Sequence, residues 1–270
     1  MKAVSTLRVY PSIAPANGAG SRGAPNRGSL IGVRDLGDVL ELLHTSPDRW
    51  DTLLLAGREW RHLARFNQAW EQSVAAMQRN SRVNSMRSFA PALVPGEPRE
   101  LPETTVEQWR LWHAKPDKIR AQFLVGTATV TAVLVGRQWW SWTPGQGLRT
   151  NGGDPSSSHG RGPGEVLVEG PNLLSSLRFH SVSRTTFLSR SAYLVGATPA
   201  TRDAHVPPFV LHALGAGADR YELVVDAEVG VVWRSQAELG GDVFRVLEVD
   251  EVGIDEPLEE NLFMGDRLGA

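Results

Sequence analysis

The chain has 270 residues, with 28 Lys and Arg against 30 Asp and Glu, and no cysteine. At about 150 residues per domain this length fits one or two domains, and it is enough to bury a sizeable core. The net charge of -2 argues against a strongly basic nucleic-acid binder. The lack of cysteine excludes disulfides, Cys-ligated zinc, iron–sulfur clusters and thiol catalysis.

The first 29 residues are rich in Pro, Gly, Ala, Asn and Ser, so we expect residues 1–29 to be a disordered leader. Gly18, Gly20 and Gly23 fit the pattern G-x-G-x-x-G, but no strand precedes them and Pro25 follows at once. This context argues against a nucleotide site. The stretch lacks the 7–15 apolar residues of a signal peptide, and no run approaches the ~18 apolar residues of a membrane span. The sequence therefore predicts a cytoplasmic protein.

The next part of the chain alternates between helix and strand. Apolar residues at helical spacing predict a short helix over 36–44, and the sequence WDTLLLAGREW predicts a strand over 50–60. An amphipathic helix is expected over 61–79, followed by a loop over 80–103. The polar face of the helix includes Arg61, Arg65 and Arg79, which are candidates for contact with a membrane surface.

From residue 104 onward the hydrophobic period changes to two, which is typical of half-buried strands. A short helix is expected over 172–179, and a low-complexity segment predicts a mobile loop over 150–164. The predicted strands cover 119–125, 127–135, 138–143, 185–188, 191–197, 220–225, 231–239 and 243–249, with a final extended piece to 263.

This order predicts an α+β, mostly β fold, a curved antiparallel meander of about nine or ten strands. Three short helices are expected to form a lid over its concave side. We expect one domain over residues 30–265, followed by a tail over 266–270.

The residues that usually carry catalysis or bind metals show no recognisable pattern. No two of the seven histidines are separated by two, three or four residues, and neither G-x-S-x-G nor S-x-x-K occurs. The sequence therefore predicts no enzyme activity, no metal and no cofactor.

The nine tryptophans are the strongest signal in the sequence. They either fill a core or line an apolar cavity inside the curved sheet. In the second case, the expected ligand-binding residues are Trp112, Phe123, Trp140, Trp142, Trp233 and Phe244.

Three segments together resemble the LolA-type lipoprotein carriers. KPDKIRAQF (Lys115–Phe123) is similar to that family's Pro-Gly-x-Phe-Arg-hydrophobic strand, and GRQWWSWTP (Gly136–Pro144) is similar to its Gly-x-x-x-Trp-x-Tyr-x-Pro strand. The segment Tyr221–Phe263 is similar to the closing hairpins and the terminal Asp-x-x-Leu-Phe signature. The same fold type includes mycobacterial lipid-binding lipoproteins and the sensor domain of sigma-E regulatory proteins.

The resemblance implies an unclosed β-barrel whose helical lid covers a hydrophobic cavity. It also implies non-enzymatic binding of an acyl chain or a lipidated peptide, as a carrier or a sensor. By its position in the motif, Arg120 is implied to hydrogen-bond the lid closed.

A second hypothesis is a protein–protein interaction or regulatory module with a filled core. It would act through the Arg-rich helix or through the acidic region 219–266, which holds 14 Asp and Glu against three Arg. A simpler interpretation is that these two charged regions complement each other within the molecule. The volume of a cavity between helices and sheet separates the two hypotheses. The sequence does not name the ligand, the protein partner or the oligomeric state.

Overall fold

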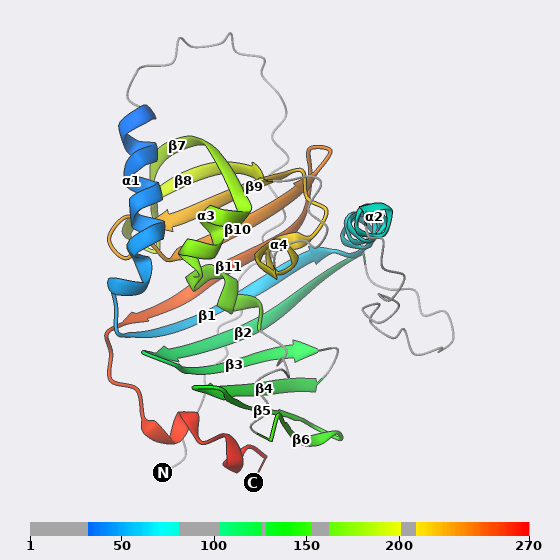
Figure 1. Cartoon of the computed structure of the whole chain (residues 1–270), viewed down its shortest axis with the longest axis vertical. Helices are drawn as coiled ribbons and strands as arrows, with labels where there is room; N and C mark the ends of the chain where they lie inside the picture. The colour runs from blue at the N-terminus through cyan, green and yellow to red at the C-terminus, as the bar shows by residue number, and fades with distance from the viewer. Residues whose placement is uncertain (1–31, 81–102, 126–127, 153–161, 201–208, 270) are drawn as a thin grey trace. The chain divides into compact units, whose positions relative to one another are not determined.

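The computed structural model describes residues 32–80, 103–125, 128–152, 162–200 and 209–269 (Figure 1). The predicted leader, most of the predicted loop 80–103 and the middle of the predicted loop 150–164 lie outside the described residues.

The elements fall into two groups of strands with helices between them. The first group contains β1 (Thr52–His62), β2 (Thr104–Ala114), β3 (Lys118–Val125), β4 (Ala128–Val135), β5 (Gln138–Thr143) and β6 (Gly147–Thr150). The second contains β7 (Leu177–Phe187), β8 (Arg190–Pro199), β9 (Arg220–Asp226), β10 (Val232–Leu239) and β11 (Asp242–Ile254). The α-helices are α1 (Gly32–Thr45), α2 (Leu63–Asn80), α3 (Gly170–Ser176) and α4 (Phe209–Gly215). The short 3₁₀ helices are η1 (Ser46–Asp48), η2 (Pro163–Val168), η3 (Glu260–Phe263) and η4 (Gly265–Arg267).

Across the described residues, eleven strands form one antiparallel sheet in the order β6-β5-β4-β3-β2-β1-β11-β10-β9-β8-β7. The sheet is not closed, since β6 and β7 are its two edges. The predicted fold class is confirmed: mostly β, antiparallel and unclosed, with a few short helices. The expectation of one continuous meander is wrong in one respect, because two meanders, β1–β6 and β7–β11, are joined by pairing of β1 with β11.

The connection from β6 to β7 decides how the sheet is covered. Because these strands are the opposite edges, the chain between them crosses one face of the sheet and places η2 and α3 on it. The helices α1, α3 and α4 lie over the same face, and α2 lies at one end of it (Figure 1). We call this the helix-covered face and the opposite one the outer face.

Trp109 anchors the crossing to the sheet. A Cβ on Gly57 of β1 would lie 2.6 Å from Trp109 Cζ2, and a Cβ on Gly164 of η2 would lie 2.5 Å from Trp109 Cζ3. The indole therefore packs between two glycines where no side chain fits, and it is 4 % exposed. Burial of such a ring stabilises the fold by about 1.5–3 kcal/mol. Gly162 and Gly164, in the predicted mobile loop, are buried here.

Strand alternation assigns each residue of the central strands to one face. Leu53 and Leu55 of β1 are fully buried on the helix-covered face, together with Leu111 of β2, which pairs with Leu55. The outer face of the central strands carries ion pairs instead, such as Arg58–Glu248 at 2.7 Å and Arg234–Glu248 at 3.2 Å.

Some local details of the structure differ from the predictions or were not predicted. The helix expected over 172–179 ends at Ser176, because Leu177–Phe179 pair with β8 and Leu177 is buried as a strand residue. The edge strand β6 is not predicted, because all its residues are exposed and it has no apolar alternation. Helix α4 is not predicted, because its seven residues are too few for a helical period to stand out.

Candidate functional site

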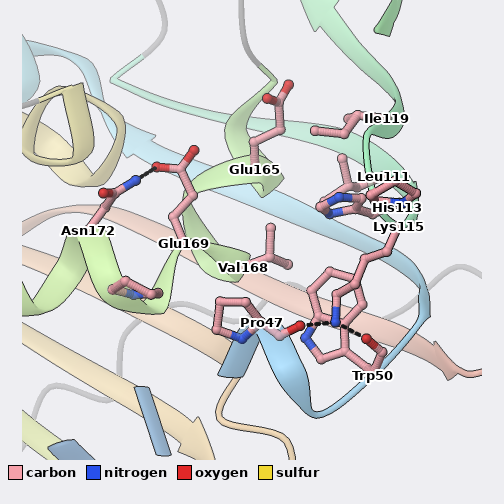
Figure 2. Close-up of a pocket in the computed structure, with 12 residues that line it drawn as sticks. Pro47, Trp50, Leu111, His113, Lys115, Ile119, Glu165, Val168, Glu169 and Asn172 are labelled. Carbon is pink, nitrogen blue, oxygen red and sulfur yellow. Dashed lines mark hydrogen bonds between the residues drawn. The ribbon is translucent and has the colours of Figure 1, made fainter. Parts of the chain in front are cut away.

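A cavity of about 430 Å³ opens on the helix-covered face, between strands β2 and β3 on one side and η1, η2 and α3 on the other. Figure 2 shows Leu111, His113 and Ile119 along one side, with Val168 and Pro47 facing them. The cavity is lined by Pro47, Trp50, Leu111, His113, Lys115, Pro116, Ile119, Glu165, Val168, Glu169, Pro171 and Asn172. Apolar side chains make up most of this wall, with His113 in its middle and the other polar groups at its ends.

Lys115 joins two segments at one end of the pocket. Its ammonium donates hydrogen bonds to the backbone carbonyls of Pro47 and Trp50 (Figure 2). It also lies 3.9 Å from the centroid of the Trp50 ring, a cation–π contact. Burial lowers the pKa of Lys115, against the opposing effect of nearby aspartates led by Asp51. These contacts fix η1 and Trp50 against the end of β2.

His113 is the polar group in the middle of the wall. Its ring packs edge-on against Trp50, with centroids 4.9 Å apart. Burial, together with the charge of Lys115, lowers the pKa of His113 to about 4. The imidazole is therefore neutral near pH 7. Among the described residues, its Nδ1 is buried without a hydrogen-bond partner, and so is Nε1 of Trp50.

Two carboxylates lie at the other end, and both have hydrogen-bond partners. Glu165 is 3 % exposed, and its Oε1 accepts the backbone N–H of Gly162 at 2.9 Å, which caps the start of η2. Glu169 accepts a hydrogen bond from Nδ2 of Asn172 at 3.1 Å (Figure 2). These contacts hold the crossing segment in the conformation that forms the pocket wall.

The pocket has the size and composition of a small-molecule binding site. A volume of 430 Å³ lies within the range of about 300–1,000 Å³ that small-molecule sites occupy, and an apolar wall with a few polar groups is their usual composition. Within the described ranges, no group of three or more His, Asp or Glu side chains could hold a metal ion. None of the described helices is long and apolar enough to span a membrane.

No family model and no curated protein matches this chain. Solved structures match it at low identity. The complex of Pseudomonas aeruginosa MucA and MucB has 13% identity, a TM-score of 0.46, and coverage of 84% of this chain and 60% of that one. An uncharacterized conserved protein from Thermus thermophilus has 11% identity, a TM-score of 0.44, and coverage of 84% and 91%. A LolA superfamily protein from Nitrosomonas europaea has 9% identity, a TM-score of 0.31, and coverage of 86% and 98%.

The chain thus spans about 60% of the length of the MucA/MucB match. These likenesses concern the fold only. The assignment of a site rests on the residues of this chain.

The residues predicted to bind a ligand do not share one face of the sheet. Trp112, Trp140 and Trp142 lie on the outer face, since Trp112 pairs with Leu54 and the other two pair with Val133 and Thr131. The segment formed by residues 260–269 packs on two of them so closely that a Cβ on Gly265 would clash with Trp140, and one on Gly269 would clash with Trp142.

The other three predicted residues face the helices. Trp233 and Phe244 are fully buried in the core, and the indole N–H of Trp233 donates to Asp226 at 2.9 Å. Phe123 packs against Gly162 of the crossing segment. Within the described part of the chain, the pocket wall includes none of the six. A ligand contact by any of them stays a prediction.

Arg120 also lies on the outer face. Its guanidinium donates to the carbonyl of Leu262 at 2.9 Å and lies 5.6 Å from the Trp112 ring. Burial without a compensating carboxylate lowers its pKa. The resemblance implied a bond from this arginine to a carbonyl of a lid. The observed bond goes to the 260–269 segment, on the face opposite the pocket.

The arginines proposed for membrane contact are used within the chain where they are described. Arg61 forms ion pairs with Glu59, at 2.8 Å, and with Glu107, while Arg65 pairs with Asp242. The side chain of Arg79 lies outside the described residues. The pair with Asp242 joins the Arg-rich helix to the acidic region, which supports charge complementarity within the molecule.

Sequence reasoning missed the residues that form the pocket, above all Trp50, His113 and Lys115. Their signal was the alternation itself: Leu111 and His113 lie on one face of β2, and Trp112 lies on the other. The prediction followed the aromatic residues, which lie outside this cavity, and the segment that completes the cavity wall is far away in sequence.

Proposed function

We propose that the protein binds one apolar or amphipathic small molecule, such as an acyl chain, in this pocket and acts as a carrier or sensor without catalysis. The observation that carries the proposal is the pocket itself, an apolar space of about 430 Å³ with a neutral His113 and a charged Lys115 at the wall. Its apolar side chains favour a hydrocarbon part of the ligand, and Lys115 and Glu169 at its ends favour a polar group there.

The experiment is a titration of the purified protein with a fluorescent fatty acid, followed by the anisotropy of the probe. Saturable binding at one site is expected. Trp50 lies in the wall, so the total tryptophan emission of the protein is expected to change in parallel. Native mass spectrometry of the same preparation tests for a co-purified lipid.

Ile119→Trp is expected to fill the pocket and weaken probe binding at least ten-fold. Leu134→Trp is the matched control, because Leu134 pairs with Ile119 on the same face but lies outside the pocket wall. Both variants need melting temperatures close to that of the parent. No saturable binding, or equal loss in both variants, would reject the proposal in favour of an interaction module without a ligand.

A further inference from the structure

The outer face of β3, β4 and β5 holds a second apolar cluster, separate from the pocket. Val133 is 1 % exposed there although it points away from the helices. What buries it is the 260–269 segment, in which Phe263 is 6 % exposed and η3 and η4 contact β3, β4 and β5 (Figure 1). The segment thus occupies an aromatic surface that includes Trp140 and Trp142.

The way the segment is attached differs from the rest of the fold. Its backbone N–H groups bond only locally, as from Leu262 to Glu259 and from Leu268 to Gly265. Among the described residues, no backbone–backbone hydrogen bond joins residues 256–269 to a strand. The segment can therefore leave without breaking a strand ladder, and its departure would expose a patch of tryptophans.

The surface contacts both the backbone and an acidic side chain of the segment. Arg120 donates to a main-chain carbonyl, that of Leu262, and Lys118 pairs with the carboxylate of Glu260 at 2.7 Å. Gly265 and Gly269 approach the two indoles so closely that any Cβ would clash. The matching ligand is a short peptide with an acidic residue, an apolar pair and then glycines four residues apart.

We propose that this surface is a peptide-binding site, that residues 260–269 are its intramolecular occupant, and that a partner peptide of the same chemistry displaces them. The complementarity is shown by the segment that lies on the surface. An intramolecular occupant competes at an effective concentration of about millimolar, so it blocks weak ligands and yields to a tight one. The site is independent of any ligand in the pocket.

The test uses a chain that lacks residues 260–270 and a fluorescein-labelled peptide with the sequence LEENLFMGDRLG, residues 258–269. We expect saturable binding to the shortened chain by fluorescence anisotropy, and binding at least ten-fold weaker to the full chain. A peptide with Gly265→Val is expected not to bind.

Two arginines on the Trp112 ring provide a matched pair. Arg120→Ala in the shortened chain is expected to weaken peptide binding by about ten-fold or more, the value of a hydrogen bond to a charged group. Arg110→Ala is expected to change it less than two-fold, because Arg110 lies 5.7 Å from the same ring but pairs with Glu251 on β11.

If the shortened chain does not fold, as judged by its melting transition, the full chain with Gly265→Val replaces it. That substitution is expected to expel the segment and admit the parent peptide, whereas Gly37→Ala, at a position with open space, is not. Equal peptide binding by the opened and the parent chains, or no binding by either, would overturn the proposal.

Discussion

The two faces of strands β2 and β3 are closed in different ways. On the helix-covered face, a segment in the middle of the chain crosses the sheet and is held by Trp109 between Gly57 and Gly164. Next to it, the buried pair Arg245–Glu59 joins β11 to β1 at 2.8 Å. On the outer face, residues 260–269 cover the sheet through one arginine–carbonyl bond, one exposed ion pair and close glycine–indole contacts.

Because the two covering segments are attached differently, we expect the two faces to have different functions. The crossing segment is continuous with β6 and β7 and cannot leave without unpacking the core, so it forms a lasting wall for a pocket. The outer segment makes no ladder bonds within the described residues, so it can exchange. Substitutions on the helix-covered face should therefore affect the free energy of unfolding more than those on the outer face.

Gly57→Val is expected to have the largest effect. Its Cβ would clash with the backbone oxygen of Glu248 and would also strike Trp109. The Glu248 backbone cannot move without disrupting the pairing of β1 with β11, and Trp109 cannot move without displacing η2, so we expect a loss of about 3 kcal/mol or more in urea unfolding. Gly37→Ala, in a helix with open space around it, should instead stabilise by about 0.5–1 kcal/mol. A loss below about 1 kcal/mol for Gly57→Val would show that this anchor is not rigid.

His113, on the helix-covered face, should make the free energy of unfolding depend on pH. Its pKa of about 4 in the folded state lies below the 6.5 of an exposed histidine. Between these values the unfolded chain binds a proton that the folded chain does not, so stability falls as the pH drops from about 6.5 to 4. The expected loss is about 3 kcal/mol, measured by urea unfolding at several pH values. In His113→Gln this part of the slope should disappear, and an unchanged slope would place the titration elsewhere.

The sequence was sufficient for the strands but not for the site. Alternation over residues 119–125 predicts a strand and correctly separates Arg120 from Ile119. The same logic gives the mostly β, antiparallel fold, because turns such as that at residues 240–241 join neighbouring strands. What alternation cannot give is which face carries the pocket.

That information lies in contacts between distant segments. The pairing of β1 with β11 joins residues about 200 positions apart and makes β6 and β7 opposite edges. Only then does the chain between them cross a face. The wall residues Val168 and Glu169 follow a stretch of Gly, Ser and Pro that predicts a loop, and the burial of Val168 depends on packing against the sheet. Similarly, Gly265 packs on Trp140, and a glycine adds nothing to the hydrophobic pattern from which strands and helices are predicted.

Arg120→Leu tests whether the two faces act independently. Loss of the bond to the Leu262 carbonyl should cost about 1.5–3 kcal/mol in urea unfolding. Arg110→Leu should cost less than about 1 kcal/mol, because its pair with Glu251 is long, at 3.6 Å, and exposed. Affinity for a fatty-acid probe should not change, since Arg120 lies on the face opposite the pocket. The sequence resemblance implies that Arg120 holds a lid closed, and loss of such a bond would raise ligand affinity. A marked gain in probe affinity would therefore show that the faces are coupled.

The Lys118–Glu260 pair should have the smallest effect. Its atoms are 2.7 Å apart, but the two side chains are 30 % and 78 % exposed, so water and salt screen their attraction. A double-mutant cycle of Lys118→Met and Glu260→Gln is expected to give a coupling of about 0.2–1 kcal/mol in low salt, and to lose most of it at about 1 M NaCl. Lys118 also lies 6.0 Å from the Phe263 ring, so Met at this position keeps some of the apolar contact. A coupling above about 2 kcal/mol that persists in salt would mean that this end of the segment is firmly attached. In that case the outer face would be closed as permanently as the helix-covered one.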